Sequence, residues 1–115
     1  MTRLVRALGY SFQGFRYTWL EEAAFRQEVL LALLVVPAGL FLGHTGVERA
    51  LLVSPMLLVL VVELLNSAIE AVVDRSGIES HPLAGMAKDM GSAAVMLSLA
   101  LLGTVWLLIL SDPAH

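Results

Sequence analysis

Four polar side chains recur along a helix-forming segment whose first half is almost wholly apolar. In LVVELLNSAIEAVVDR, residues 60–75, they follow one another at steps of three, four and four residues: Glu63, Asn66, Glu70 and Asp74. Because a helix turns by about 100° per residue, the four side chains lie within one sector of about 80° and extend over about 16 Å. A charged side chain at hydrocarbon depth costs about 2.5 to 3.5 kcal/mol on insertion scales, so such residues usually face protein, water or an ion. We therefore interpret this acidic stripe as a candidate functional site.

Other charged side chains are available to complete such a site. The acidic ones include Glu22, Glu28 and Asp89, and the cations Arg26 and Lys88 accompany them. Carboxylate oxygens in a chain without cysteine suit magnesium better than zinc, and magnesium commonly binds together with substrate phosphates. With a cation for the transferred phosphate and a carboxylate base for an acceptor hydroxyl, these residue types would support phosphoryl transfer.

The usual nucleotide-binding signatures are absent from the sequence. It contains no G-x-x-x-x-G-K-[ST], no G-x-G-x-x-G and no kinase catalytic-loop motif, which excludes a conventional soluble ATP-binding fold. Glutamates inside membranes also serve as proton relays. From the residue types alone, a phosphotransferase and a proton-coupled exporter therefore compete nearly evenly.

The composition is typical of a small membrane protein. Of 115 residues, 58% are hydrophobic, and the mean hydropathy is +0.83. Residues 93–110 carry no charged side chain, whereas the helices of a soluble bundle each show a polar face. We expect one integral-membrane domain over residues 1–115, with no removable signal peptide and no nucleic-acid partner. The lack of cysteine excludes disulfides and thiolate-metal sites.

The predicted fold is an all-α membrane protein, with an N-terminal amphipathic surface helix followed by three transmembrane helices. The surface helix covers residues 1–27, where apolar side chains recur within about 80° of the helical wheel: Leu4, Leu8, Phe12, Phe15 and Trp19. The predicted spans are 28–43, 47–73 and 89–110. A loop over residues 74–88 joins the last two, because Gly77, Pro82 and Gly85 interrupt the apolar pattern.

Positive charge is distributed unevenly about these spans. Most of the arginine and lysine residues lie before the first span or beside the 74–88 loop, and Arg49 alone lies on the other side. Because cytoplasmic loops carry the excess of positive charge, we predict a multi-pass protein of the bacterial inner membrane. Its N-terminus and its 74–88 loop would be cytoplasmic, and its C-terminus would be periplasmic.

Three separate motifs resemble those of the prokaryotic diacylglycerol kinase family of small integral-membrane enzymes. They are EEAAFRQE at residues 21–28, ELLNSAIEAVVDR at 63–75 and AKDMGSAAV at 87–95, and weaker matches such as GYSFQG extend the similarity over most of residues 3–110. The resemblance implies a homotrimer whose active sites lie between neighbouring subunits, at the boundary of membrane and cytoplasm. It implies ATP-dependent phosphorylation of 1,2-diacyl-sn-glycerol to phosphatidic acid. Undecaprenol kinase, a related lipid kinase, is the nearest alternative.

The resemblance also implies roles for individual residues. Glu63 matches the catalytic base, with Asn66 and Lys88 as further catalytic residues, and Glu22 and Glu70 match the ligands of the Mg²⁺ that accompanies ATP. The residues implied to bind Mg²⁺ and ATP are Arg3, Tyr10, Glu22, Glu70, Glu79, Ser80, His81, Lys88 and Asp89. Those implied to bind the lipid are Arg3, Phe12, Trp19, Ala24, Gln27, Glu28, Arg49, Glu63, Ser92 and Trp106. His44 and His115 receive no role.

The spacing of the acidic residues is consistent with these roles. Glu63 lies two helical turns, about 10.5 Å, deeper than Glu70, which suits a base that meets a lipid hydroxyl while the metal meets ATP. Glu22 must approach Glu70 from another helix if both are to bind one ion. Because three thin helices enclose little volume, oligomerisation is physically reasonable.

Overall fold

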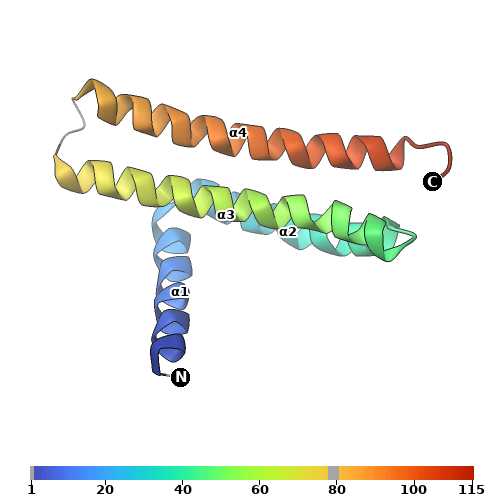
Figure 1. The fold of residues 1–115 in the computed structure, drawn as a ribbon, viewed down its shortest axis with the longest axis horizontal. Helices are drawn as coiled ribbons and strands as arrows, with labels where there is room; N and C mark the ends of the chain where they lie inside the picture. The colour runs from blue at the N-terminus through green and yellow to red at the C-terminus, as the bar shows by residue number, and fades with distance from the viewer. Residues whose placement is uncertain (1, 78–80) are drawn as a thin grey trace.

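Four helices make up the part of the chain that the structure describes. The computed structural model describes residues 2–77 and 81–115, with α1 over Thr2–Glu21, α2 over Ala23–Leu42, α3 over Gly46–Ser76 and α4 over Pro82–Leu110. By length and composition α2, α3 and α4 could each cross a membrane, and α1 runs crosswise to them (Figure 1). The predicted all-α fold, with an N-terminal helix and three candidate spans, is confirmed.

The helix boundaries differ from the predicted ones at two places. α1 ends at Glu21, the backbone of Glu22 is extended, and α2 begins at Ala23. Residues 23–27 therefore belong to the first span instead of the surface helix. The 74–88 connection is also shorter than predicted. α3 continues to Ser76 and is followed by Gly77 in the left-handed conformation, with φ of 70°.

α4 begins at Pro82, within the segment predicted to be a loop. Proline is favoured in the first turn of a helix because the N–H that it lacks would have no helical partner there. His81 caps the same end, since its Nδ1 accepts a hydrogen bond of 3.1 Å from the Leu83 N–H. The residues that signalled a loop are therefore helix-terminal residues, and Lys88 and Asp89 lie on a helix.

α3 is the central helix of the molecule. It packs against both α2 and α4, whereas the backbones of α2 and α4 do not come close to each other in the described ranges. The side chains of Leu52, Met56 and Val59, all on α3, are fully buried. Trp106 on α4 adds a polar tie, because its Nε1 donates a hydrogen bond of 2.9 Å to the Leu52 carbonyl.

Most other large apolar side chains point outward. They include Phe41, which is 85% exposed, and long apolar stretches of α2 and α4. Apolar patches this extensive are unusual on a soluble monomer and mark contact with lipid or with another protein. The fold thus agrees with a helical layer whose outer faces are covered by lipid or by further subunits.

Glycine lets α2 and α3 approach closely. Gly39 is buried, and a Cβ atom placed on it would lie 3.1 Å from Leu52 Cβ and 3.2 Å from Val53 Cγ2. Gly46, at the start of α3, is exposed and has no such neighbour within 4 Å. Close packing of small residues is a usual source of helix association in membranes, where the hydrophobic effect does little between helices.

We predict that Gly39→Val destabilises the protein by about 1–3 kcal/mol, because the added side chain overpacks the contact between α2 and α3. Gly46→Val is the matched control, and its effect should stay within about 0.5 kcal/mol. The measurement is the free energy of unfolding in detergent micelles, by denaturant titration. Equal effects of the two substitutions would contradict the packing argument.

Candidate active site on α3

The deeper half of the acidic stripe is buried in the helical layer. Glu63 is 4% exposed and Asn66 is 8% exposed, both on α3. The Asn66 Nδ2 donates a hydrogen bond of 3.1 Å to Glu70 Oε1, one turn further along the helix. This bond fixes the Asn66 amide and uses only one carboxylate oxygen of Glu70. The other oxygen of Glu70 could therefore bind a metal ion.

Asn66 is positioned by the neighbouring helix. Gly91 on α4 is buried, and a Cβ atom placed there would overlap the Asn66 Oδ1. That Oδ1 is buried and has no hydrogen-bond partner among the described residues. An unpaired buried acceptor is costly and suggests an incoming donor or cation. Sequence reasoning did not select Gly91, although its place in the AKDMG motif was a signal.

Glu22 joins the stripe from the break between α1 and α2. Burial is the main cause that raises the pKa of its carboxyl group, and the negative charges of Glu70, Glu21 and Asp74 raise it further, in that order. The repulsion from Glu70 places the two predicted metal ligands within electrostatic reach of each other, although they come from different helices. A divalent cation would relieve this repulsion, so the carboxylates fit Mg²⁺, which prefers oxygen ligands.

A hollow of about 370 Å³ opens beside Glu22, between α1 and α3. Its lining includes both apolar and polar side chains: Gly14, Tyr17, Thr18, Glu21, Glu22, Leu64, Ser67, Ala68 and Ala71. The buried Ser67 Oγ has no partner among the described residues, whereas Thr18 Oγ1 donates to the Gly14 carbonyl at 2.8 Å. The hollow therefore offers an approach to the carboxylates from the side of the surface helix.

Charged side chains fix the helices around the site. Lys88 Nζ lies 2.7 Å from Asp74 Oδ1, which pairs the start of α4 with the end of α3. Arg26 Nη1 donates to the carbonyls of Trp19 at 2.6 Å and Leu20 at 3.2 Å, so the first turn of α2 satisfies the C-terminal end of α1. This contact joins α1 to α2 at the point where α1 turns away from α2, α3 and α4. Asp89, next to Lys88, is exposed.

Glu28 is a further buried carboxylate on α2. It is 9% exposed, and its Oε2 has no hydrogen-bond partner among the described residues. The neighbouring predicted lipid-binding residues Ala24 and Gln27 are exposed on the same helix. Glu28 thus extends the set of carboxylates into α2.

Other predicted site residues lie apart from the stripe. Arg3 and Tyr10 line a separate hollow on α1, of about 700 Å³. Arg49 lies in the first turn of α3, at the opposite end of that helix, and Trp106 lies in the last turns of α4. The remaining exposed ones are Phe12, Trp19, His81 and Ser92. The predicted residues Glu79 and Ser80 fall outside the described ranges.

Comparison with known proteins places this arrangement in a family. The model of the prokaryotic diacylglycerol kinase family matches residues 9–110. This chain belongs to that family. Diacylglycerol kinase of Escherichia coli strain K12 is 50% identical over 109 residues, which cover 95% of this chain and 89% of the relative.

Two other relatives have similar coverage. Diacylglycerol kinase of Haemophilus influenzae is 48% identical over 106 residues, covering 92% of this chain and 90% of the relative. The corresponding protein of Pseudomonas aeruginosa is 49% identical over 110 residues, covering 96% and 89%. The resemblance identified from the three motifs is therefore confirmed over nearly the whole chain.

We predict that Glu70→Gln lowers the pKa of Glu22, because one of the negative charges that oppose its ionisation is removed. The pKa should remain above that of an ordinary glutamate, since burial is the larger cause. The measurement is a pH titration of ¹³C-labelled glutamate by NMR, with the Glu22 signal assigned from its loss in Glu22→Gln. Asp74→Asn is the control and should lower the pKa less, because Asp74 contributes least.

The sign of the pH effect also follows. A raised pKa means that Glu22 keeps its proton to higher pH than an exposed glutamate, and metal ions bind the deprotonated form. Mg²⁺ affinity should therefore rise with pH through the titration of Glu22. A Glu22 titration that is unchanged in Glu70→Gln would contradict the coupling of the two residues.

Proposed function

We propose that the protein phosphorylates the free hydroxyl group of 1,2-diacyl-sn-glycerol with ATP to give phosphatidic acid. The observation that carries the proposal is family membership at about 50% identity, combined with a buried glutamate two turns from a carboxylate pair. Seven residues separate Glu63 from Glu70, or about 10.5 Å of helix. This separation supports a site in which a lipid hydroxyl meets the deeper glutamate and the phosphate donor meets the outer one.

Glu63 would act as the general base. The lipid hydroxyl oxygen attacks the γ-phosphorus of ATP in line, the bond from that phosphorus to the bridging oxygen breaks, and ADP leaves with the bond's electrons. The hydroxyl proton passes to a carboxylate oxygen of Glu63. Asn66, held by Glu70 and by the close approach of Gly91, would keep the base and the metal ligands in register.

Glu22 and Glu70 would hold Mg²⁺, which supplies positive charge against the phosphate oxygens when it is bound. Lys88 would add a second positive charge from the start of α4. Its partner Asp74 is more than half exposed, so phosphate oxygens could compete with Asp74 for the ammonium group. Glu22 and Glu70 would thus hold the metal ion, and Lys88 would neutralise the phosphate charge that the metal ion does not.

The outer parts of the substrates would contact the remaining predicted residues. On this proposal, nucleotide contacts come from Arg3, Tyr10, Glu79, Ser80, His81 and Asp89, and lipid contacts come from Phe12, Trp19, Ala24, Gln27, Glu28, Arg49, Ser92 and Trp106. Arg3 and Tyr10 border one hollow, which supports a common role for these two. The apolar faces of α2 and α4 would keep the acyl chains in the bilayer.

The proposed active form is a homotrimer in the bacterial inner membrane, with the N-terminus cytoplasmic and the C-terminus periplasmic. Its support is the open shape of one chain, in which α4 packs only on α3 among the described helices. An apolar hollow of about 520 Å³ between α3 and α4 offers a surface for a neighbouring subunit; it includes Leu58, Val62, Ala94 and Leu101. The carboxylates would then be closed off by a second copy.

We predict that Glu63→Gln lowers the rate of phosphate transfer by at least about 100-fold, because the amide cannot accept the hydroxyl proton. The assay follows labelled phosphate from ATP to diacylglycerol in proteoliposomes, with Mg²⁺ and with chelator. Asp112→Asn, an exposed substitution beyond α4, should leave the rate unchanged. An unaltered oligomer on size exclusion shows that the Gln variant is assembled, and retained activity would remove Glu63 as the base.

The same preparation separates the alternative activities. A higher rate with undecaprenol than with diacylglycerol would make the protein an undecaprenol kinase with the same site. Transport driven by a pH gradient in sealed vesicles, without ATP consumption, would instead support a proton-coupled exporter. Each of these results would overturn diacylglycerol as the substrate.

We predict that Gly91→Ala lowers kcat by about 10- to 100-fold, because the added methyl group displaces Asn66 and misaligns the site. Gly85→Ala on the same helix is the matched control, since a Cβ atom there has no neighbour within 4 Å. In an Asn66→Ala background, Gly91→Ala should have no further effect. If Gly91→Ala lowered kcat by the same factor in the Asn66→Ala background, Gly91 would act through another contact.

A further inference from the structure

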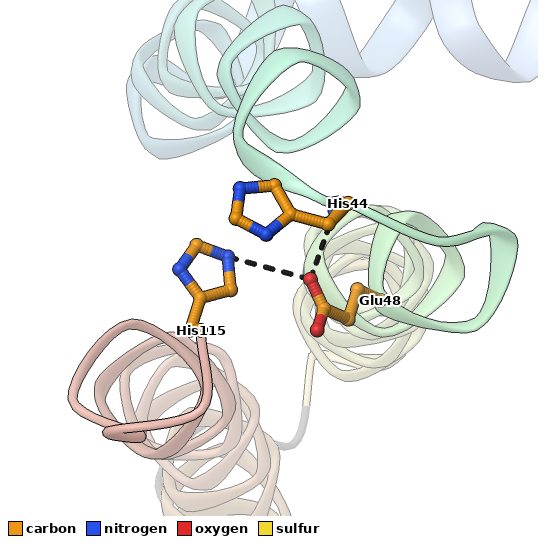
Figure 2. Close-up of side chains that lie close together, drawn as sticks. All are labelled: His44, Glu48 and His115. Carbon is orange, nitrogen blue, oxygen red and sulfur yellow. Dashed lines mark hydrogen bonds and ion pairs between the residues drawn. The ribbon is translucent and has the colours of Figure 1, made fainter.

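Two histidines and a glutamate meet at the end of the helical layer opposite Glu22 and Glu70. His44 lies in the connection between α2 and α3, Glu48 in the first turn of α3, and His115 in the segment that follows α4. Figure 2 shows the three side chains converging, with the Glu48 carboxylate beside both imidazole rings. The kinase proposal uses none of the three.

The three side chains are close and oriented. One donor atom from each lies within 4.8 Å of the others. The two rings are stacked, with centroids 4.0 Å apart and planes 11° apart. Glu48 Oε1 lies 3.3 Å from His115 Nε2 and accepts a hydrogen bond of 2.9 Å from the His44 backbone N–H.

The backbone around the cluster is fixed by capping. Thr45 Oγ1 accepts a hydrogen bond of 3.1 Å from the Glu48 N–H at the start of α3. His115 Nε2 also lies 3.0 Å from the Leu42 carbonyl at the end of α2. The glutamate is therefore held by its own helix terminus, and the segment after α4 is brought to it from a distant part of the sequence.

We propose that His44, Glu48 and His115 bind a divalent transition-metal ion of the zinc class. Two imidazole nitrogens and one carboxylate oxygen are a common protein ligand set for Zn²⁺, which leaves a fourth position for water. With metal–ligand distances of about 2.0–2.2 Å, tetrahedral ligand atoms lie about 3.3 Å apart. The three ligand atoms lie within 4.8 Å of one another, so an ion bound here would draw the side chains closer together.

The ligand types distinguish this cluster from the carboxylates on the other end of α3. Imidazole nitrogens favour zinc-class ions, whereas sites made of oxygen ligands favour magnesium. A proton and a metal ion compete for the same imidazole nitrogen, so metal affinity should fall as pH is lowered.

Metal binding would reinforce contacts between parts of the chain that are distant in sequence. His115 already contacts the end of α2 and the start of α3, and the metal would add a further tie between the α2–α3 connection and the segment after α4. An ion bound by the folded state alone stabilises that state by RT ln(1 + L/Kd), where L is the free ion concentration. Binding of the ion should therefore stabilise this end of the molecule.

The test measures Zn²⁺ binding by the full chain in detergent micelles, without a histidine tag. A chromogenic chelator competes for the metal, and excess Mg²⁺ occupies the carboxylate site. We expect one Zn²⁺ per chain, an affinity that falls with decreasing pH, and a higher melting temperature with Zn²⁺. His44→Ala and His115→Ala should each weaken binding by more than the roughly 10- to 100-fold typical of changes outside the direct ligands.

Two further variants make the test decisive. His81→Ala removes the third histidine of the chain, away from this cluster, and should bind Zn²⁺ normally. Glu48→Gln keeps an oxygen acceptor for the His44 N–H but removes the charge, and should weaken binding. Unchanged binding by His44→Ala and His115→Ala, or loss of binding in Glu70→Gln instead, would overturn the proposal. Size exclusion of each variant confirms that its fold is retained.

Discussion

Placing Glu63 and Asn66 inside an apolar helical layer is the constraint on which the rest of this molecule depends. A buried polar group without a partner costs free energy, so each must be bonded, hydrated or used. The chain meets part of this cost locally, through the bond from Asn66 to Glu70 one turn away. Asn66 Oδ1, Ser67 Oγ and Glu28 Oε2, all near the stripe, have no hydrogen-bond partner within residues 2–77 and 81–115. Groups that stay unsatisfied beside clustered carboxylates are typical of a site that binds a cation and a polar substrate.

Helix packing on both sides of α3 places other groups around this buried polar region. On one side, Gly91 removes the Cβ atom of α4 that would otherwise occupy the position of the Asn66 amide. On the other side, the break at Glu22 ends α1 and turns the Glu22 carboxylate toward the negative charge of Glu70. A continuous helix through residue 22 would present that carboxylate in a different direction. The single extended residue is therefore as important to the site as the stripe itself.

The sequence predicted the features that depend on periodicity and composition. The stripe, the three spans and the amphipathic first helix each follow from spacing within one segment, because a helix repeats every 3.6 residues. The prediction that the last span begins at residue 89 was wrong, because α4 begins at Pro82. Glycine and proline signal a loop and a helix terminus equally well. The approach of Gly91 to Asn66 could not be predicted, because the register of two packed helices depends on all of their contacting side chains. The same holds for His44 and His115, which lie 71 residues apart in sequence and stack only in the folded chain.

The two ends of α3 carry ligand sets of different chemistry. At the carboxylate end, Glu22 and Glu70 are half-buried and offer oxygen donors, a ligand type that Mg²⁺ commonly takes together with phosphate oxygens. At the histidine end, His44 is exposed and the other two side chains are half-buried, so an ion can reach the imidazoles directly from water. Since imidazole ligands favour zinc-class ions, whereas Glu22 and Glu70 offer oxygen donors alone, the two ions need not compete. One helix can therefore present the proposed reactive site at one end and the proposed zinc-class site at the other.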